Sequence, residues 1–537
     1  MFIVAMTFNK KIIISFCIFT IIFTCFSGCI LKDIFGAVTF SLDSYSIIDD
    51  QGFPAISVYF NCSGRVNLKT FDTSSNMVDY DFFYHEGNTT LNIGDYKETI
   101  NPGKYSFKVY DRNDKEIFNK DLSFKGSNLS IIKCEQQWWE DKNKYILIGL
   151  KIYVQNLGDI PVYPFYADII VDSKTYTDDI VSSVVLPSFS NYLYFNLIHE
   201  GVFNDDTFEI VLKDKNNINL AIGSFNFSVK KSISTKYYSE GLDKTIAVPY
   251  PDFLYNYYTN LDRIVVEDYS VFILDRYDDV YLDLILNRII ESYSNGRFDL
   301  KSDVEKIEYV NGFVQALEYK LDSDLNDSNE YPRYPIETLF NGNGGGDCED
   351  KSILSASLLE KLDYEVALLR LPNHMAVGVK LDEDAVSRYN FYTDSYYFLE
   401  TTNEGKPLGF IPKEYESPSE LYVYPIKQTE FVIHNWKNGV VTIYSKTESG
   451  DFVKVIAFIE NLGNKTAENI EFKGLFYNNQ ELEISSESIA VGDIYAFDKK
   501  KVILSVPKPT NLDTWFETRI IINGKVVDTQ KSNDKFD

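Results

Sequence analysis

The stretch NGNGGGDCEDKS (341–352) places four glycines within five positions, just before a single cysteine, Cys348. A phosphate-binding loop would end in Gly-Lys-Ser/Thr, but here Asp350 precedes the Lys-Ser pair and would repel a phosphate. The remaining interpretation is a nucleophilic cysteine at the start of a helix, where unpaired N–H groups and the helix dipole favour a thiolate. Asp347, Glu349 and Asp350 oppose this effect unless their side chains point away. A thiolate at Cys348 therefore needs a nearby cation, which is usually a histidine.

Hydrophobic periodicity around Cys348 predicts helices followed by strands. Three segments carry apolar residues at helical spacing: 279–294, 302–320 and the segment that begins at Cys348. Ser302 and Glu305 form the pattern of a capping box at the start of the second of these. Three strand-like runs come next, at 365–371, 374–381 and 396–402. Helices followed by an antiparallel sheet indicate an α+β domain, which we assign to residues 239–426.

The glycines before Cys348 and the histidines of the chain supply the rest of the predicted chemistry. Gly344–Gly346 would let the backbone approach a substrate and place N–H groups near a developing oxyanion. Of four histidines, only His374 falls in the α+β domain, at the start of an apolar strand. A third group should orient its imidazole. Glu400, at the end of the next strand, is the acid best placed, and Asp394 is the alternative.

The blocks GGGDCEDKSILSASLL, PNHMAVGVKL and YYFLETTNEG resemble, in this order, the transglutaminase-like cysteine proteinase superfamily. The segment FVQALEYKLD…YPRYPIETLFNGNGGGDCED is similar to the prokaryotic branch of that superfamily, and the resemblance covers residues 240–425. It implies a papain-like core with a Cys-His-acid triad. In this chain Cys348 would be the nucleophile, His374 the general base and acid, and Glu400 the orienting acid.

Glu400 and Gln315 bear on how closely this chain follows the superfamily pattern. Glu400 stands where the superfamily usually has aspartate, and its extra methylene changes the reach of the carboxylate. Thr401-Thr402, which follow it, partly match the usual Asp-Pro-Thr. Gln315 lies on the helix that precedes the cysteine block, where papain-like enzymes carry an oxyanion-hole amide. The alternative for Gln315 is an ordinary solvated glutamine on a helix.

Outside the α+β domain the sequence predicts β-sandwiches. Residues 37–235 consist of short alternating runs rich in Ile, Val, Tyr and Phe, separated by turn residues. Two sandwiches fit this length, at 37–127 and 128–238, and a third is expected over 427–537. The fold class is therefore multidomain, with an α+β papain-like core flanked by all-β sandwiches.

A repeated pattern links the second and the last of these sandwiches. KIYVQNLGDIPVYPFYADIIVDSK (151–174) parallels AFIENLGNKTAENIEFKGLFYNNQ (457–480). Each copy has an apolar strand, the tripeptide Asn-Leu-Gly, a polar turn and a second alternating strand, which predicts one hairpin per copy. The pattern resembles the extracellular β-sandwich modules of prokaryotic surface proteins.

Residues 1–36 have the features of an export signal or membrane anchor. Two lysines precede an apolar run, 12–26, as in a secretory signal. The Ser-Gly-Cys ending resembles a lipoprotein cleavage box with Cys29 as the lipid-bearing residue, although Phe26 stands where leucine is usual. The alternative is an uncleaved helix, because 12–31 provides about one membrane span of apolar residues. Both alternatives place the rest of the chain at the cell surface, facing outward.

Cysteine usage and net charge limit the partners. Cys62 and Cys134 could form a disulfide in an oxidising exterior, which would leave Cys348 unpaired. The net charge of −27, spread along the chain, argues against a nucleic-acid partner, because phosphates require a basic surface. We expect a protein or peptide substrate instead.

The acidic segment DSDLNDSNE (322–330) departs from the EF-hand calcium loop at two required positions. Asp327 and Arg333 occupy the positions where an EF-hand requires glycine and glutamate. The segment is therefore interpreted as a solvated acidic loop, and no cofactor is predicted. A looser Ca²⁺ site is the alternative.

These features predict an exported, membrane-anchored cysteine peptidase or amidase that acts on envelope or extracellular proteins through a thioester. In a cross-linking transglutaminase an amine would replace water in the second step. None of the four tryptophans lies in the α+β domain to shield a thioester from water, which favours hydrolysis. The alternative from another class is a non-catalytic surface or adhesion protein whose α+β domain binds a ligand.

Overall fold

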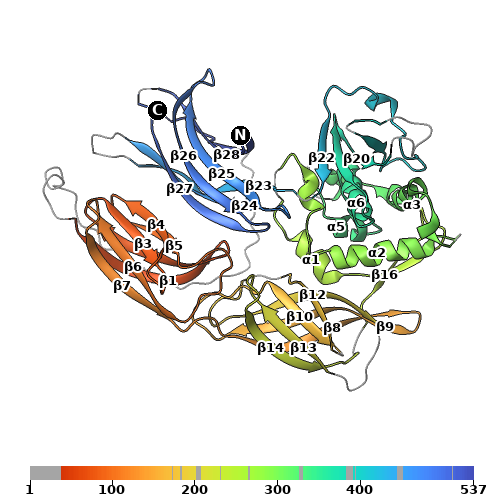
Figure 1. Ribbon diagram of the computed structural model, residues 1–537, viewed down its shortest axis with the longest axis horizontal. Helices are drawn as coiled ribbons and strands as arrows, with labels where there is room; N and C mark the ends of the chain where they lie inside the picture. The colour runs from red at the N-terminus through yellow and green to blue at the C-terminus, as the bar shows by residue number, and fades with distance from the viewer. Residues whose placement is uncertain are drawn as a thin grey trace, which may run out of the picture.

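Three β-sandwiches and one α+β domain make up the computed structural model (Figure 1). The structure describes residues 38–536 apart from 172, 182–183, 201–206, 230–231, 264–265, 295, 326–330, 383–390, 394, 428, 444–450 and 511. The β-rich, multidomain architecture expected from the sequence is confirmed. The predicted signal or anchor, with Cys29, lies outside the described residues. Within them, no helix has both the length and the apolar character needed to span a bilayer.

Each sandwich packs a three-stranded sheet against a four-stranded one. The first consists of β1 (Phe40–Asp50), β2 (Phe53–Cys62), β3 (Val66–Phe71), β4 (Met77–Phe83), β5 (Gly87–Asn92), β6 (Gly103–Asp111) and β7 (Glu116–Phe124). The second consists of β8 (Leu129–Asp141), β9 (Lys144–Asn156), β10 (Tyr166–Val171), β11 (Lys174–Asp179), β12 (Ser190–Glu200), β13 (Thr207–Lys213) and β14 (Asn219–Asn226). The third consists of β23 (Val432–Ile443), β24 (Phe452–Asn461), β25 (Ala467–Tyr477), β26 (Glu483–Ile494), β27 (Lys499–Pro507), β28 (Trp515–Ile522) and β29 (Lys525–Lys531).

The strand order is the same in all three sandwiches. The sheets are β1-β2-β5 with β4-β3-β6-β7, β12-β9-β8 with β11-β10-β13-β14, and β23-β24-β27 with β26-β25-β28-β29. In each, the second strand is the centre of the smaller sheet, and the third and sixth strands are the centre of the larger one. The recurrence indicates three copies of one topology, although the sequence pattern revealed only two of them.

The Asn-Leu-Gly tripeptides mark the crossing between two sheets, so the prediction of one hairpin per copy is wrong. β9 and β10 belong to different sheets, as do β24 and β25. Asn156 donates to the carbonyls of residues 160 and 185 at 2.7 and 2.9 Å, and accepts from the N–H of Gly158 at 2.9 Å. Asn461 makes the equivalent bonds to residues 465, 494 and 463, at 2.7, 3.1 and 3.1 Å. The buried asparagine supplies the hydrogen bonds that the backbone loses where it leaves a sheet.

The last sandwich packs against the first (Figure 1), so the chain returns to its beginning. Two nearly buried lysines of the last sandwich form ion pairs with the first: Lys454 with Asp81 at 2.8 Å, and Lys501 with Asp79 at 2.6 Å. The rings of Phe53 and Phe458 stack nearby, with centroids 5.6 Å apart. Removal of one residue of such a pair would leave a buried charge uncompensated. The two ion pairs therefore fix the relative position of the two sandwiches.

The α+β domain is built from short helices and an antiparallel sheet of order β21-β20-β19-β22. Its helices are α1 (Asp252–Thr259), α2 (Asp279–Ser292), α3 (Asp303–Ala316), α4 (Asp322–Leu325), α5 (Pro335–Phe340) and α6 (Cys348–Glu360), with 3-10 turns η1 (Tyr269–Phe272), η2 (Phe298–Leu300) and η3 (Lys413–Tyr415). Its strands are β15 (Thr235–Tyr238), β16 (Ile246–Pro249), β17 (Glu318–Tyr319), β18 (Gly345–Gly346), β19 (Val366–Leu371), β20 (His374–Lys380), β21 (Tyr396–Leu399) and β22 (Tyr422–Ile426).

The predicted capping box at the start of α3 is confirmed. Ser302 accepts from the N–H of Glu305 at 3.3 Å, and the Glu305 carboxylate accepts from the N–H of Ser302 at 3.1 Å. The helix is shorter than expected and ends at Ala316, because residues 318–319 pair in parallel with 345–346. This pairing places the end of α3 beside the glycines that lead into α6.

The second sandwich and the α+β domain share one hydrophobic core. Trp139 and Tyr194 of the sandwich pack in the same buried cluster as Tyr281 and Ile285 of α2. The boundary expected at residue 238 falls inside the β15–β16 hairpin, which carries the chain between the two. The second sandwich therefore contributes to the hydrophobic core that supports the candidate site.

We predict that Asn461→Ala lowers the local free energy of unfolding of the last sandwich by about 1–3 kcal/mol, because three carbonyls and two N–H groups lose their side-chain partner. Native-state hydrogen exchange of the peptide 452–477 in the full-length chain measures this. Asn479→Ala, at an exposed position in the same sandwich, is the matched control and should change exchange little. Equal effects of the two substitutions would contradict the role given to Asn461.

Candidate active site

Cys348 is the first residue of α6, as the sequence predicted, with Asp347 as its N-cap. The helix is buried along almost its whole length, which is unusual for a segment that contains Asp350 and Lys351. The ammonium of Lys351 donates to the carbonyls of Gln315 and Leu317 at 3.0 and 2.8 Å, at the end of α3. Burial lowers the pKa of Lys351 to about 8. These bonds fix the start of α6 against the end of α3.

Asp350 holds the other side of this first turn. Its buried carboxylate accepts from the N–H of Arg333 at 2.8 Å and forms an ion pair with the guanidinium of the same residue. Burial raises the pKa of Asp350 to about 8, although Arg333 acts in the opposite direction. Asp350 is therefore a structural partner of Arg333.

His374 begins β20, and its ring lies beside the buried carboxylate of Glu400. The Nε2 atom of His374 is 3.2 Å from Oε2 of Glu400. On its other side the imidazole stacks on Tyr415, with ring centroids 4.7 Å apart and an angle of 8° between the planes. The structure thus brings together two of the three residues of the predicted triad and fixes the orientation of the imidazole.

Glu400 directly follows β21 and is fully buried. Its Oε1 atom accepts from the N–H groups of Thr402 and Asn403 at 2.8 and 3.3 Å, and from the Thr402 hydroxyl. Burial alone would raise the pKa of Glu400, but the hydrogen bonds from His374 and Thr402 outweigh it and lower the pKa to about 2. Glu400 is therefore an ionised partner for His374 across the physiological pH range.

The thiol of Cys348 faces an acid rather than the imidazole. Its Sγ atom donates to Oε2 of Glu349 at 3.1 Å, and no hydrogen bond joins it to His374 among the described residues. Burial and the charges of Glu349 and Asp347 raise the pKa of Cys348, whereas the N–H of Met375 acts in the opposite direction. The helix N-terminus does not yield a thiolate in this arrangement. The contact with Met375 nevertheless places the thiol beside the start of β20.

Gln315 does not fit the predicted role of an oxyanion donor. It is buried, and its amide donates to the carbonyls of Glu400 and Lys406 at 2.8 and 3.0 Å. Its Oε1 atom accepts from the N–H of Gly405 at 3.0 Å. Both amide hydrogens are therefore engaged with the loop that follows β21. Gln315 is a positioning residue for Glu400, and it is not the solvated glutamine of the alternative interpretation either.

The glycines before Cys348 serve packing rather than approach to a substrate. Gly345 has a φ of +130°, and a Cβ there would lie 2.1 Å from the carbonyl oxygen of Glu318. A Cβ on Gly346 would lie 2.2 Å from Oδ2 of Asp350. Both glycines are buried in the short pairing of β17 with β18. This close backbone contact explains why the sequence has glycines directly before Cys348.

The remaining sequence-predicted residues lie elsewhere. Cys62 and Cys134 are both free thiols, so the proposed disulfide is wrong. Cys62 packs on the core of the first sandwich and Cys134 on that of the second, which keeps them in separate domains. Asp394, the alternative acid, lies outside the described residues, as does the segment 326–330 of the acidic loop.

Two tyrosines of the site were not identified from the sequence. Tyr415 stacks on the imidazole of His374, and burial, followed by the charges of Glu414, Cys348 and Glu400, raises its pKa. Tyr319 in β17 is 51% exposed, and burial together with the charges of Cys348, Asp347 and Glu349 raises its pKa to about 12. Tyrosines are so frequent in this chain that only their position in the fold distinguishes these two.

Comparison with known proteins does not assign a family. No protein-family model matches the chain, and no curated protein matches it significantly. Among solved structures, red sea bream transglutaminase is 9% identical, with 71% of this chain and 79% of that chain covered and a TM-score of 0.18. The YadV chaperone is 12% identical over 35% of this chain and 99% of its own, with a TM-score of 0.13. Dimeric latent PorU from Porphyromonas gingivalis is 8% identical over 93% of this chain and 33% of its own, with a TM-score of 0.14. TM-scores of this size do not establish a shared fold.

We predict that Glu349→Gln makes Cys348 more reactive toward iodoacetamide at neutral pH. The substitution removes a negative charge that disfavours the thiolate, so the pKa of Cys348 falls and more thiolate is present. The rate should rise about threefold for each unit by which the pKa falls, because a less basic thiolate is also a weaker nucleophile.

Peptide mass spectrometry of the alkylated full-length chain measures the rate at Cys348 separately from the other cysteines. Glu360→Gln, at the exposed end of the same helix, is the matched control. An unchanged or slower rate in Glu349→Gln would show that this carboxylate does not restrain the thiol.

Proposed function

We propose that the chain is an exported, membrane-anchored cysteine peptidase or amidase with a papain-like, transglutaminase-like core. Its substrates would be proteins or peptides of the cell envelope or exterior. The observation that carries the proposal is the pairing of His374 Nε2 with the buried Glu400 carboxylate at 3.2 Å, beside the helix that begins with Cys348. The three sequence blocks that resemble the transglutaminase-like superfamily support it, and the apolar segment 12–31 supports the membrane anchor.

In the proposed reaction, Nδ1 of His374 takes the proton of Cys348 as Sγ bonds to the carbonyl carbon of an amide. The C–N bond then breaks, the proton moves from His374 to the leaving amine, and a thioester remains on Cys348. Water attacks the thioester with His374 as general base, which releases a carboxylic acid and restores the thiol. Glu400 stabilises the imidazolium that forms in each step, and Tyr415 holds the ring in its plane.

This reaction requires the thiol to turn from Glu349 toward His374. The hydrogen bond between Cys348 and Glu349 is a contact of the resting site, and a rotation of the cysteine side chain breaks it. The N–H of Met375 and the first N–H groups of α6 then favour negative charge on the sulfur or the substrate oxygen. Activation by substrate binding is consistent with a thiol that is protonated when the site is empty.

The surroundings of Cys348 favour hydrolysis over amine transfer. Two tyrosines, Tyr319 and Tyr415, interact electrostatically with Cys348, and Tyr319 is half exposed to solvent. A thioester beside an exposed tyrosine is accessible to water. An enzyme that transfers the acyl group to an amine must instead exclude water from this intermediate.

A second candidate function is a non-catalytic binding module on a surface protein. The hydrogen bond from Cys348 to Glu349 and the raised pKa of the thiol favour it, because an activated nucleophile would have a lowered pKa. The three flanking sandwiches suit either function. The two candidates differ in whether an amide bond is cleaved.

We predict that the full-length chain cleaves labelled denatured casein, and that Cys348→Ala abolishes cleavage. Glu400→Gln should lower kcat by about 10²–10⁴-fold, because the imidazolium loses its ionised partner. Glu420→Gln, an exposed residue outside the site, is the control and should leave the rate unchanged. A glutaminyl peptide with a fluorescent amine, assayed in parallel, distinguishes transfer from hydrolysis. Cleavage that survives in Cys348→Ala, or no reaction in either assay, would contradict the proposal.

A further inference from the structure

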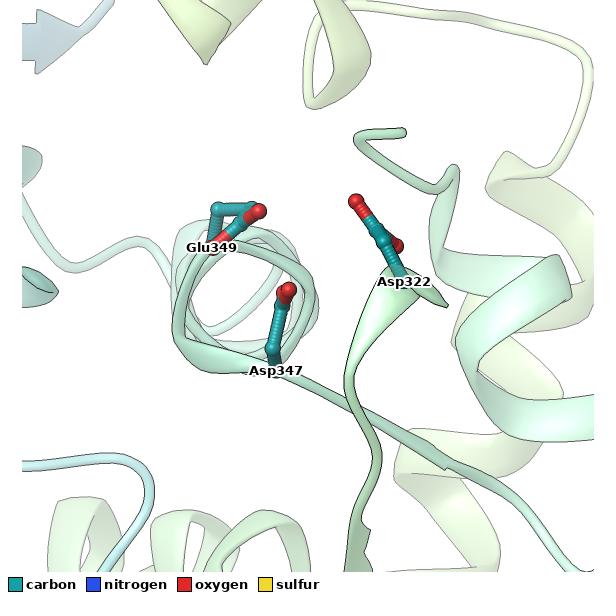
Figure 2. A group of neighbouring side chains, drawn as sticks. All are labelled: Asp322, Asp347 and Glu349. Atoms are coloured by element: carbon teal, nitrogen blue, oxygen red, sulfur yellow. The ribbon is translucent and has the colours of Figure 1, made fainter. Parts of the chain in front are cut away.

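Three acidic side chains gather beside Cys348, outside the proposed triad. Asp322 comes from the start of α4, Asp347 is the N-cap of α6, and Glu349 lies in its first turn. One carboxylate oxygen from each lies within 4.8 Å of the other two, and all three residues are buried. Figure 2 shows the carboxylates of Asp347 and Asp322 directed toward the space between the two chain segments, with Glu349 at its edge.

The hydrogen bonding of Asp347 points to a missing ligand. Its side chain does not cap α6, and its Oδ1 atom is buried without a hydrogen-bond partner, in a residue that is 8% exposed. A buried carboxylate oxygen normally has a donor or a cation beside it. The Asp347 carboxyl is hydrogen-bonded to Glu349 and lies close to Asp322, and two ionised carboxylates cannot share such a bond. A cation bound between the three groups would give the Oδ1 atom of Asp347 a partner.

The protein's own cations do not complete this cluster. Arg333 forms ion pairs with Asp322 at 2.8 Å and with Asp350. Its single positive charge therefore already compensates two carboxylates. In the part of the chain that the structure describes, no lysine or arginine forms an ion pair with Asp347 or Glu349. Arg333 is thus shared between Asp322 and Asp350.

We propose that Asp322, Asp347 and Glu349 form a binding site for a divalent cation of the Ca²⁺ type. Carboxylate oxygens are the ligands of hard cations, and Ca²⁺ accepts an irregular shell completed by water. Oxygens on opposite sides of a Ca²⁺ ion lie about 4.6–5.2 Å apart. The three oxygens, all within 4.8 Å of one another, are therefore close enough to share one Ca²⁺ ion.

The site connects the acidic loop to the thiol. Asp322 is the first residue of the segment 322–330, so the loop takes part in cation binding through one residue rather than as an EF-hand. Glu349 is shared, because one of its oxygens accepts the hydrogen bond of Cys348. Cation binding does not depend on the proposed function, since it requires neither His374 nor a reactive thiol.

Terbium luminescence tests the site in the full-length chain, because Tb³⁺ occupies Ca²⁺ sites and is excited through nearby tyrosines. The charges of Asp347 and Glu349 act on the Tyr319 hydroxyl, which places this ring near the cluster. Tyr331 follows the acidic loop, and its N–H donates to Asp322. We expect Tb³⁺ emission that Ca²⁺ displaces. Asp347→Asn and Glu349→Gln should each weaken Ca²⁺ binding, followed by calorimetry, by about tenfold or more.

Glu318→Gln removes an exposed carboxylate from the adjoining strand and is the matched control, which should bind as the wild type does. Tyr319→Phe combined with Tyr331→Phe should reduce the emission while leaving Ca²⁺ binding by calorimetry intact, and this arm remains informative if an acidic variant fails to fold. Circular dichroism checks the fold of each variant. Absent binding, equal binding by folded Asp347→Asn and wild type, or undiminished emission from the double tyrosine variant would overturn the proposal.

Discussion

A buried hydrogen-bond network around α6 holds the three segments that carry Cys348, His374 and Glu400. Ser352 donates to the carbonyl of Met375 at 3.0 Å, one residue after His374, and also lies 2.9 Å from the hydroxyl of Thr401, one residue after Glu400. Ser355 and Asn311 extend the network to the carbonyl of Glu400 from the side of α3. Because unsatisfied polar groups in such a core are costly, the network specifies one arrangement of the three segments. The candidate site is positioned by side chains that take no part in its chemistry.

The acidic residues around Cys348 have different structural roles, which explains why several of them lie beside one thiol. Asp350 is paired with Arg333 and fixes the helix, whereas no lysine or arginine among the described residues forms an ion pair with Asp347 or Glu349. Like charges in a buried cluster are unfavourable unless they are neutralised by protons or by a bound cation. The same two residues raise the pKa of the thiol, so whatever neutralises them also changes the surroundings of the sulfur. Catalysis and cation binding would then share the first turn of α6.

Much of this arrangement follows from local sequence signals. Helical spacing and a glycine-rich entry located the start of α6 at Cys348, and the position of a polar ring at the head of an apolar strand singled out His374. Side-chain direction could not be predicted in this way: Gln315 turns to the loop after β21, and Cys348 faces Glu349, because tertiary contacts decide both. The sequence also could not show that each Asn-Leu-Gly connects two different sheets, because the pattern of a strand does not identify the strand it pairs with.

The most direct test of the catalytic account is to look for an acyl group on Cys348. The full-length chain would be mixed briefly with p-nitrophenyl acetate, quenched in acid and digested, and the peptide containing Cys348 would be weighed by mass spectrometry. If Cys348 is the nucleophile, an acetyl thioester at Cys348 forms and decays with turnover, and it forms much more slowly in His374→Ala. Acetylation of other side chains alone, or equal rates at Cys348 in the variant and the wild type, would contradict this mechanism.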